Sequence, residues 1–205
     1  MEESESFAVG HFAFGYVLGK ASSNVAKTEI NVPLVLTLSV IPDADIMLPF
    51  LQHRGPTHSI QIAFMVFIPI FAIYRKKAIP YFLALIQHPL IGDYIAGGRI
   101  QLLWPLTSQY YGIEMSITSQ TNITLEWIIF LASTIIMLKA KNTVTLFQPH
   151  NSNLILIVPM LTVLLPTFLS FPLVVPTWLI PPHLVYMTIF LTSIIVDLSK
   201  ILRDI

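Results

Sequence analysis

The sequence contains no cysteine and few charged residues. Its 205 residues include 11 Lys plus Arg and 11 Asp plus Glu, so only 11% are charged and the formal net charge is zero. Without cysteine, the chain forms no disulfide and no thiolate metal site, and any metal ion must be bound through histidine nitrogen and carboxylate oxygen. The zero net charge provides no broad basic surface, and we therefore expect no nucleic-acid partner.

Apolar residues, in contrast, are abundant. They make up 55% of the chain, and the mean hydropathy is +0.75. A soluble domain usually carries about 25% charged residues and could not bury so much apolar surface. The composition predicts an all-α, polytopic integral membrane bundle in the lipid bilayer, with about six to seven transmembrane helices, some kinked or partly re-entrant. We expect a single domain over residues 1–205, in which 1–106 carries the site and 107–205 adds further transmembrane helices.

Apolar runs and basic residues predict how the chain crosses the membrane. The expected apolar segments are Phe7–Gly19, Ile30–Leu51, Ile60–Tyr74, Ala78–Ala96, Ile123–Leu138, Leu154–Val175 and His183–Leu198. Lysine and arginine in short loops favour the cytoplasmic side, which places Arg75-Lys76-Lys77 inside. If every segment crosses once, the protein is a multi-pass protein of the cell membrane with its amino terminus outside and its carboxyl terminus in the cytoplasm. The acidic and imidazole side chains of residues 11–93 then lie near the outer face.

The most unusual stretch is His53-Arg54-Gly55-Pro56-Thr57-His58-Ser59, which lies between two strongly apolar segments. It combines two imidazoles, a guanidinium and two hydroxyls, and we interpret it as the centre of a binding site. Gly55-Pro56 breaks the backbone between the histidines, and Thr57 is expected to cap a helix that begins at His58. Arg54 matches the geometry of a phosphate oxygen, although it could equally anchor the chain at the membrane interface.

Carboxylates elsewhere in the first half occur close to histidines. An ionised group near the bilayer centre costs about 2.5–3.5 kcal/mol, so such residues usually face a cavity or a partner. Asp43 and Asp45 are two apart and point to nearly opposite sides of a helix, so both serve one site only if the helix ends or unwinds there. Otherwise they merely mark a helix end. His88 and Asp93 are five apart, about 140° on a regular helix, and converge only if the helix is kinked. A buried histidine bonded to a carbonyl is the alternative for His88.

These residues predict a metal site with seven ligand candidates. They are His11, Asp43, Asp45, His53, His58, His88 and Asp93. Imidazole and carboxylate ligands suit zinc, and a carboxylate bias would admit manganese or iron. The set exceeds what one ion needs, so one or two ions are expected. Asp45, Arg54 and Thr57 are the predicted catalytic residues, with Asp45 accepting a proton from water.

Three polar residues of the second half are harder to place. Glu126 is either a further ligand or a carboxylate near a helix amino terminus, where it is favourable in any case. His183 is expected at the membrane interface. Asp197 and Lys200 are three apart and are interpreted as a surface pair.

With these residues in view, the chain resembles the YdjM-like family of membrane-bound, metal-dependent hydrolases. The resemblance is carried by His11, Pro42-Asp43-Ala44-Asp45, His53–Ser59 and the run His88-Pro89-Leu90-Ile91-Gly92-Asp93. It covers about the first half of the chain, and the second half matches only as membrane helices. The resemblance implies hydrolysis and metal dependence. A more remote similarity to zinc-dependent phospholipase C favours phosphate esters.

The leading hypothesis is a metal-dependent hydrolase near the outer membrane face that acts on a phospholipid or a lipid-linked phosphate ester. The first alternative is a transporter for a metal ion or protons, which would need polar residues that continue towards the inner face. The second is a non-catalytic membrane protein with a structural metal, whose site would be closed to water.

Overall fold

The computed structural model describes residues 8–48, 50–113, 115–116, 118–169 and 175–204. Within these ranges the chain is helical with connecting loops and forms no strand, only an isolated antiparallel bridge between Ile100 and Tyr111. The expected all-α class is therefore confirmed. The α-helices are α1 Ala8–Ala26, α2 Val32–Leu38, α3 Ile60–Tyr74, α4 Ile79–Gln87, α5 Gln120–Lys139, α6 Asn142–Leu146, α7 Ile157–Pro159, α8 Leu165–Leu169 and α9 Ile180–Arg203.

Shorter segments interrupt or extend these helices. The 3₁₀ turns are η1 Ile41–Met47, η2 Pro56–His58, η3 Arg75–Ala78, η5 Asn151–Leu156 and η7 Thr177–Leu179, and the π-helical segments are η4 His88–Gly97 and η6 Met160–Leu164. Together, η5, α7, η6 and α8 form one long helical segment over 151–169, and η7 continues into α9. In the same way, η4 directly continues α4.

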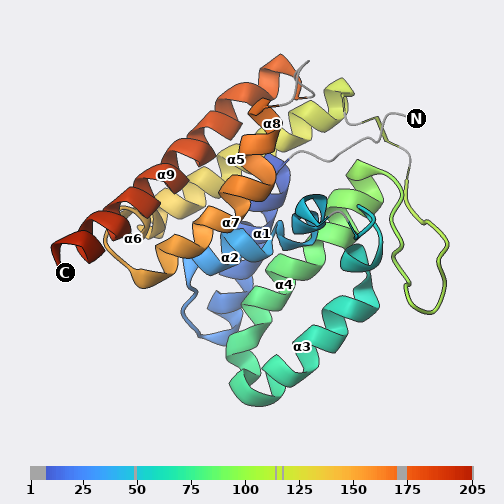
Figure 1. Ribbon diagram of the computed structural model, residues 1–205, viewed down its shortest axis with the longest axis horizontal. Coiled ribbons are helices and arrows are strands. Elements are labelled where there is room, and N and C mark those ends of the chain that lie inside the picture. The colour runs from blue at the N-terminus through green and yellow to red at the C-terminus, as the bar shows by residue number, and fades with distance from the viewer. Residues whose placement is uncertain (1–7, 49, 114, 117, 170–174, 205) are drawn as a thin grey trace.

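Helix α1 lies at the centre of the molecule, where it contacts α2, α4, α5 and α9 (Figure 1). Glycine allows the close approach: a Cβ atom on Gly15 would lie 2.4 Å from Cβ of Ser39. On the side facing α9, the ring of Phe12 packs 5.0 Å from Tyr186 and 5.2 Å from Phe190. This apolar core fixes α1 between the helices of the second half and the α2–α4 unit that carries the candidate site.

Three segments are long and apolar enough to cross a membrane: 120–139, 151–169 and 177–203. They support the expected membrane protein, but the predicted number of about six to seven spans is not confirmed. The expected span Ile30–Leu51 is wrong as a single helix. Helix α2 has only 7 residues and gives way to η1, because Ser39 bonds its own helix backbone and Pro42 provides no N–H donor.

Two expected runs extend differently from the prediction. The first was expected to begin at Phe7, which lies outside the described residues, and α1 continues to Ala26, past Gly19. The run Leu154–Val175 includes residues 170–174, which also lie outside the described part.

Helix α3 has 15 residues, and only Ala63 is buried among them. At about 1.5 Å per residue it is shorter than the apolar core of a bilayer.

Candidate metal centre

The structure brings the seven predicted ligands together from α1 and from the segments around η1, η2 and η4. Helix α1 provides His11, η1 provides Asp43 and Asp45, the loop before η2 provides His53, η2 provides His58, and η4 provides His88 and Asp93. All except His53 are buried, and His58 and His88 are completely inaccessible. Residues from four separate parts of the chain therefore meet in the protein interior.

Four side-chain atoms form the tightest group: Nε2 of His58, Nε2 of His88, an oxygen of Asp43 and an oxygen of Asp93. The two nitrogens are 3.3 Å apart. Asp43 Oδ1 lies 3.3 Å from His58 Nε2 and 3.1 Å from His88 Nε2, and Asp93 Oδ2 lies 3.4 Å and 3.2 Å from the same atoms. Ligands at tetrahedral zinc are about 2.0–2.1 Å from the ion, which puts them about 3.3 Å from one another. These five distances match the separations between the ligands of a zinc-like ion.

Hydrogen bonds at the opposite ring nitrogens make both imidazoles suitable ligands. Nδ1 of His88 lies 2.9 Å from the carbonyl oxygen of Ser39, which only accepts, so this nitrogen carries the proton. Nδ1 of His58 lies 3.0 Å from Thr57 Oγ1 and 3.4 Å from an oxygen of Asp45. In the neutral form of each ring, Nε2 then presents its lone pair to the centre of the group. Such outer partners orient metal-binding histidines in general.

The π-helical segment η4 explains how His88 and Asp93 converge. A π-helix bonds each residue to the fifth one along the chain, so a spacing of five brings two side chains over one another. A regular α-helix would separate them by about 140°. The kink expected from Pro89 and Gly92 thus takes the form of a wider turn.

Irregular backbone also explains how both aspartates of η1 reach the site. Helix α2 ends at Leu38, before Asp43, which is the break that convergence of the two aspartates requires. Their carboxylates approach the ring of His58 from opposite ends. Asp43 faces Nε2, whereas Asp45 faces Nδ1. The aspartates therefore have different surroundings, with only Asp43 in the four-atom group.

Asp45 has both oxygens engaged by neighbouring side chains. Oδ1 lies 2.8 Å from His53 Nδ1, and Oδ2 accepts a hydrogen bond of 2.5 Å from Thr57. Burial alone would raise the pKa of Asp45, but hydrogen bonds from His53, His58 and Thr57 hold it well below its usual range. Asp45 is therefore an ionised group that orients two histidines.

Thr57 does not cap a helix, contrary to the expectation. Helix α3 begins at Ile60, and Ser59 caps it by accepting from the backbone N–H of Gln61. Thr57 lies one turn earlier in η2, where its hydroxyl is directed at Asp45. The reason is the 3₁₀ turn Pro56–His58, which delays the start of the helix.

Arg54 is buried beside the group, with Nη2 at 3.7 Å from Asp93 Oδ1. Its backbone has a positive φ of 61°, and its carbonyl accepts from the N–H of Gln101. Asp93 thus faces Arg54 with one oxygen and the two imidazoles with the other. Arg54 is therefore enclosed by protein next to Asp93, which disfavours the anchor alternative.

His11 borders the group from α1. Its ring stacks on His88 with the centroids 3.8 Å apart and an interplanar angle of 19°. A Cβ atom on Gly92 would lie 1.9 Å from Cε1 of His11, so only glycine leaves room for this ring. His11, Asp43 and His88 offer ligand atoms within 4.8 Å of one another, as do Asp43, His53 and His58. Two further ligand positions therefore adjoin the central one.

Sequence reasoning missed three residues that build the site. Ser39 offers its carbonyl to His88, and Gln87 donates to the carbonyls of both His11 and Ser39 at 3.2 Å. Gly92 provides the space for His11. Gln87 was detectable as an amide in an apolar segment next to His88, whereas nothing distinguishes Ser39 in the sequence.

The uncertain polar residues of the second half are also buried. Glu126 and His183 are 8% and 0% exposed. His183 is enclosed by protein, and its Nδ1 bonds the carbonyl of Leu179 one turn earlier. Its expected place at the membrane interface stays a prediction. The surface pair expected for Asp197 is wrong: Asp197 is buried, and its carboxylate accepts the backbone N–H of His150 at 2.5 Å.

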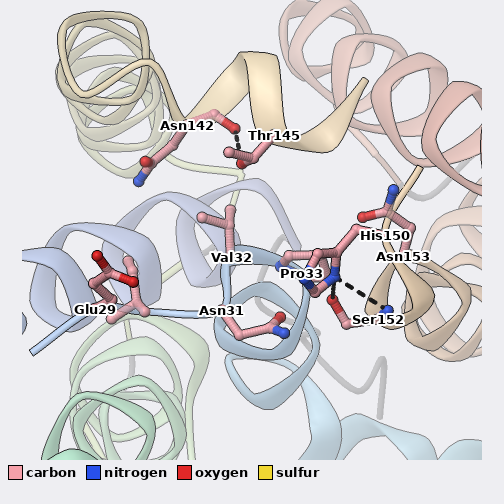
Figure 2. Close-up of a pocket in the computed structure, with 10 residues that line it drawn as sticks. Glu29, Asn31, Val32, Pro33, Asn142, Thr145, His150, Ser152 and Asn153 are labelled. Atoms are coloured by element: carbon pink, nitrogen blue, oxygen red, sulfur yellow. Dashed lines mark hydrogen bonds between the residues drawn. The ribbon is translucent and has the colours of Figure 1, made fainter. Parts of the chain in front are cut away.

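A cavity of about 310 Å³ lies away from the candidate ligands, between the α1–α2 connection, α6 and η5 (Figure 2). Its polar lining includes Glu29, Asn31, Asn142, His150 and Asn153. None of the seven predicted ligands contributes to it, so this cavity is not the candidate metal centre.

The family model described as YdjM inner membrane protein matches residues 7–179. The match extends well beyond the motifs of the first half, into the helices that follow α5. No curated protein and no solved structure matches the chain.

Proposed function

The chain belongs to the YdjM inner membrane protein family, and from that premise we propose that it is a membrane-embedded, metal-dependent hydrolase. The observation that carries the proposal is the four-atom group of His58, His88, Asp43 and Asp93, in which each carboxylate oxygen lies 3.1–3.4 Å from both imidazole nitrogens, as the ligands of one ion do. Buried imidazoles and carboxylates without such a partner are costly in an apolar protein, so their convergence needs an explanation.

In this proposal, the four-atom group holds a divalent ion, with zinc favoured by the mixture of nitrogen and oxygen ligands. When bound, such an ion polarises an ester and lowers the pKa of a coordinated water to about 7. The group of His11, Asp43 and His88 would be the site of a second ion. Manganese and iron remain alternatives wherever oxygen ligands dominate.

The side chains of His53 and Asp45 form the proposed proton-accepting pair. With Asp45 bonded to Nδ1 of His53, the other ring nitrogen of His53 is left to accept a proton from water. The side chain of His53 is 14% exposed, more than that of any other residue in the ion pairs of the site. Substrate is therefore proposed to approach from the His53 side. This assigns Asp45 the task of orienting His53, instead of accepting the proton itself.

Arg54 supports a phosphate ester as substrate. It is a buried guanidinium next to the ligand Asp93, and its planar donors match phosphate oxygens. A phospholipid or a lipid-linked phosphate would reach a site among membrane helices from the bilayer. The basic runs support an outer-face location, because Arg75–Lys77 lies at the end of α3 opposite to the site and favours the cytoplasmic side.

The same geometry supports a second candidate, a structural metal. Four protein ligands complete a tetrahedral ion and leave no position for water, whereas the hydrolase needs a fifth position on the ion for its water. The two candidates differ at His53, which only the hydrolase requires to be reactive.

The test combines metal analysis with turnover on protein purified in detergent. Wild type, His88→Ala, His53→Gln and the distant control His150→Ala would be assayed for bound metal by elemental analysis, then against a panel of phosphate esters. We expect His88→Ala to lose metal and turnover, and His53→Gln to keep metal and lose turnover. A folded wild type that holds metal but hydrolyses no ester would favour the structural candidate, and a metal-free wild type would contradict both.

A further inference from the structure

Glu126 places a carboxylate at the amino end of another helix. It lies on α5, is 8% exposed, and accepts a hydrogen bond from the backbone N–H of Gly10 in the first turn of α1. The contact is close: a Cβ atom on Gly10 would lie 2.5 Å from Oε1 of Glu126. Any residue larger than glycine at position 10 would therefore displace the carboxylate.

The first turn of a helix has backbone N–H groups without partners inside the helix, and these groups carry a partial positive charge. Glu126 contacts this end of the described part of α1 from a neighbouring helix. It is the seventh residue of α5, beyond the first turn of its own helix, so the expected carboxylate near a helix amino terminus occurs at α1 instead.

The next residue of α1 is the ligand candidate His11. Consecutive residues are about 100° apart around an α-helix, so Gly10 faces α5 while His11 faces η4. There its ring stacks on His88 and lies against Gly92. One turn of α1 is thus held by Glu126 on one side and touches the candidate metal centre on the other.

We propose that Glu126 is a positioning residue: by binding the first turn of α1, it sets the depth and rotation at which His11 lies over His88. This inference rests on the proposed metal centre, but it concerns the coupling between α5 and that centre. Outer partners of metal ligands usually contribute about 10–100-fold to metal affinity.

The test measures metal binding and the ligand field separately from hydrolysis. Co²⁺ would replace the native ion in detergent-purified protein, and its dissociation constant and visible absorption bands would be recorded. The variants are Glu126→Gln, which keeps an acceptor oxygen, Glu126→Asp and Glu126→Leu, which withdraw or remove it, and Gly10→Ala. Glu29→Gln is the matched control, because Glu29 is exposed and lies at the other end of α1.

We expect Glu126→Gln and Glu29→Gln to bind Co²⁺ within about threefold of wild type, and Glu126→Asp, Glu126→Leu and Gly10→Ala to bind about 10–100-fold more weakly with shifted bands. In the His11→Ala background, Glu126→Asp should have no further effect, because the two residues act through one contact. If Glu126→Asp leaves the affinity and bands unchanged in a wild type that binds Co²⁺, positioning is refuted while the metal centre stands. Additive losses in the double variant would also refute it. A wild type that binds no Co²⁺ would overturn both proposals.

Discussion

Nε2 of His58 and Nε2 of His88 lie 3.3 Å apart, although 30 residues separate them along the chain. In their neutral forms, both nitrogens present lone pairs to each other, because Ser39 and the Asp45–Thr57 pair occupy the opposite ring positions. Two facing lone pairs repel, so the arrangement is favourable only with a metal cation between the nitrogens or with a proton on one of them. The adjacent oxygens of Asp43 and Asp93 increase this preference.

The first prediction concerns the central ligands. His58→Ala and His88→Ala should each weaken zinc binding by more than about 100-fold, because removing a ligand costs more than removing an outer partner. His150→Ala should bind zinc like the wild type. The measurement is a competition titration with a chelating dye at fixed pH. Equal zinc affinity in all three variants would exclude these imidazoles as ligands.

A second prediction concerns the space beside His11. Gly92→Ala places a methyl group 1.9 Å from Cε1 of His11 and should force this ring off His88. We expect lower thermal stability, by about 1–3 kcal/mol as for other overpacked sites, together with weaker zinc binding. Gly19→Ala is the control, since its methyl group would lie 3.0 Å from the nearest side-chain carbon of Val35 and 3.5 Å from the carbonyl oxygen of Pro80, and would touch no candidate ligand. Similar zinc affinities in the two variants would argue against a role for His11.

A third prediction separates orientation from ligation. Asp45→Asn keeps the shape of the side chain but removes the charge that orients His53 and His58. If Asp45 is an outer partner, zinc should still bind, with an affinity about 10–100-fold lower. When turnover of the best ester is measured at saturating zinc, it should fall by a larger factor than the zinc affinity does. A complete loss of zinc would instead make Asp45 a direct ligand.

The fourth prediction concerns acid. Burial lowers the pKa of His58, but its contacts with Asp43 and Asp45 outweigh burial and raise that pKa. In metal-free protein this group contributes stability below the unfolded histidine pKa of about 6.5, and the contribution is lost as pH rises through the folded value. The lowered pKa of Asp45 contributes stability above the unfolded value of about 3.9, and that is lost as pH falls through the folded value.

Between about pH 4 and pH 6 both contributions are present, so acid should remove the metal by protonating its ligands while the protein stays folded. Dialysis at pH 5, followed by thermal unfolding and zinc titration at pH 7.5, measures this. Irreversible unfolding at pH 5 would contradict the prediction.

A fifth prediction tests orientation. Because the chain has no cysteine, a single introduced thiol is a unique label. In intact cells, Ser108→Cys on the loop beside the site should react with a membrane-impermeant maleimide, and Lys76→Cys should react only after lysis. Both residues are exposed, so burial does not explain a difference. The reversed pattern would place the site on the cytoplasmic side.

Much of the site was predictable because its chemistry is rare in an apolar chain. Asp43, His58, His88 and Asp93 are recognisable as costly residues that need partners. Their arrangement was not predictable, because Asp43 and Asp45 lie two apart and His88 and Asp93 five apart, spacings that separate side chains on a regular helix. The span expected over Ile30–Leu51 failed for the same reason: apolar composition indicates burial or lipid contact, and does not reveal a break such as η1.

The wide turn at η4 changes the sequence spacing at which two ligands share one face of a helix. A π-helical turn can be viewed as an α-helix with one inserted residue, so His88 and Asp93, five apart, share the face that residues four apart share in an α-helix. A histidine and an aspartate with four residues between them can therefore serve one metal site when, as here, a proline follows the first and a glycine precedes the second.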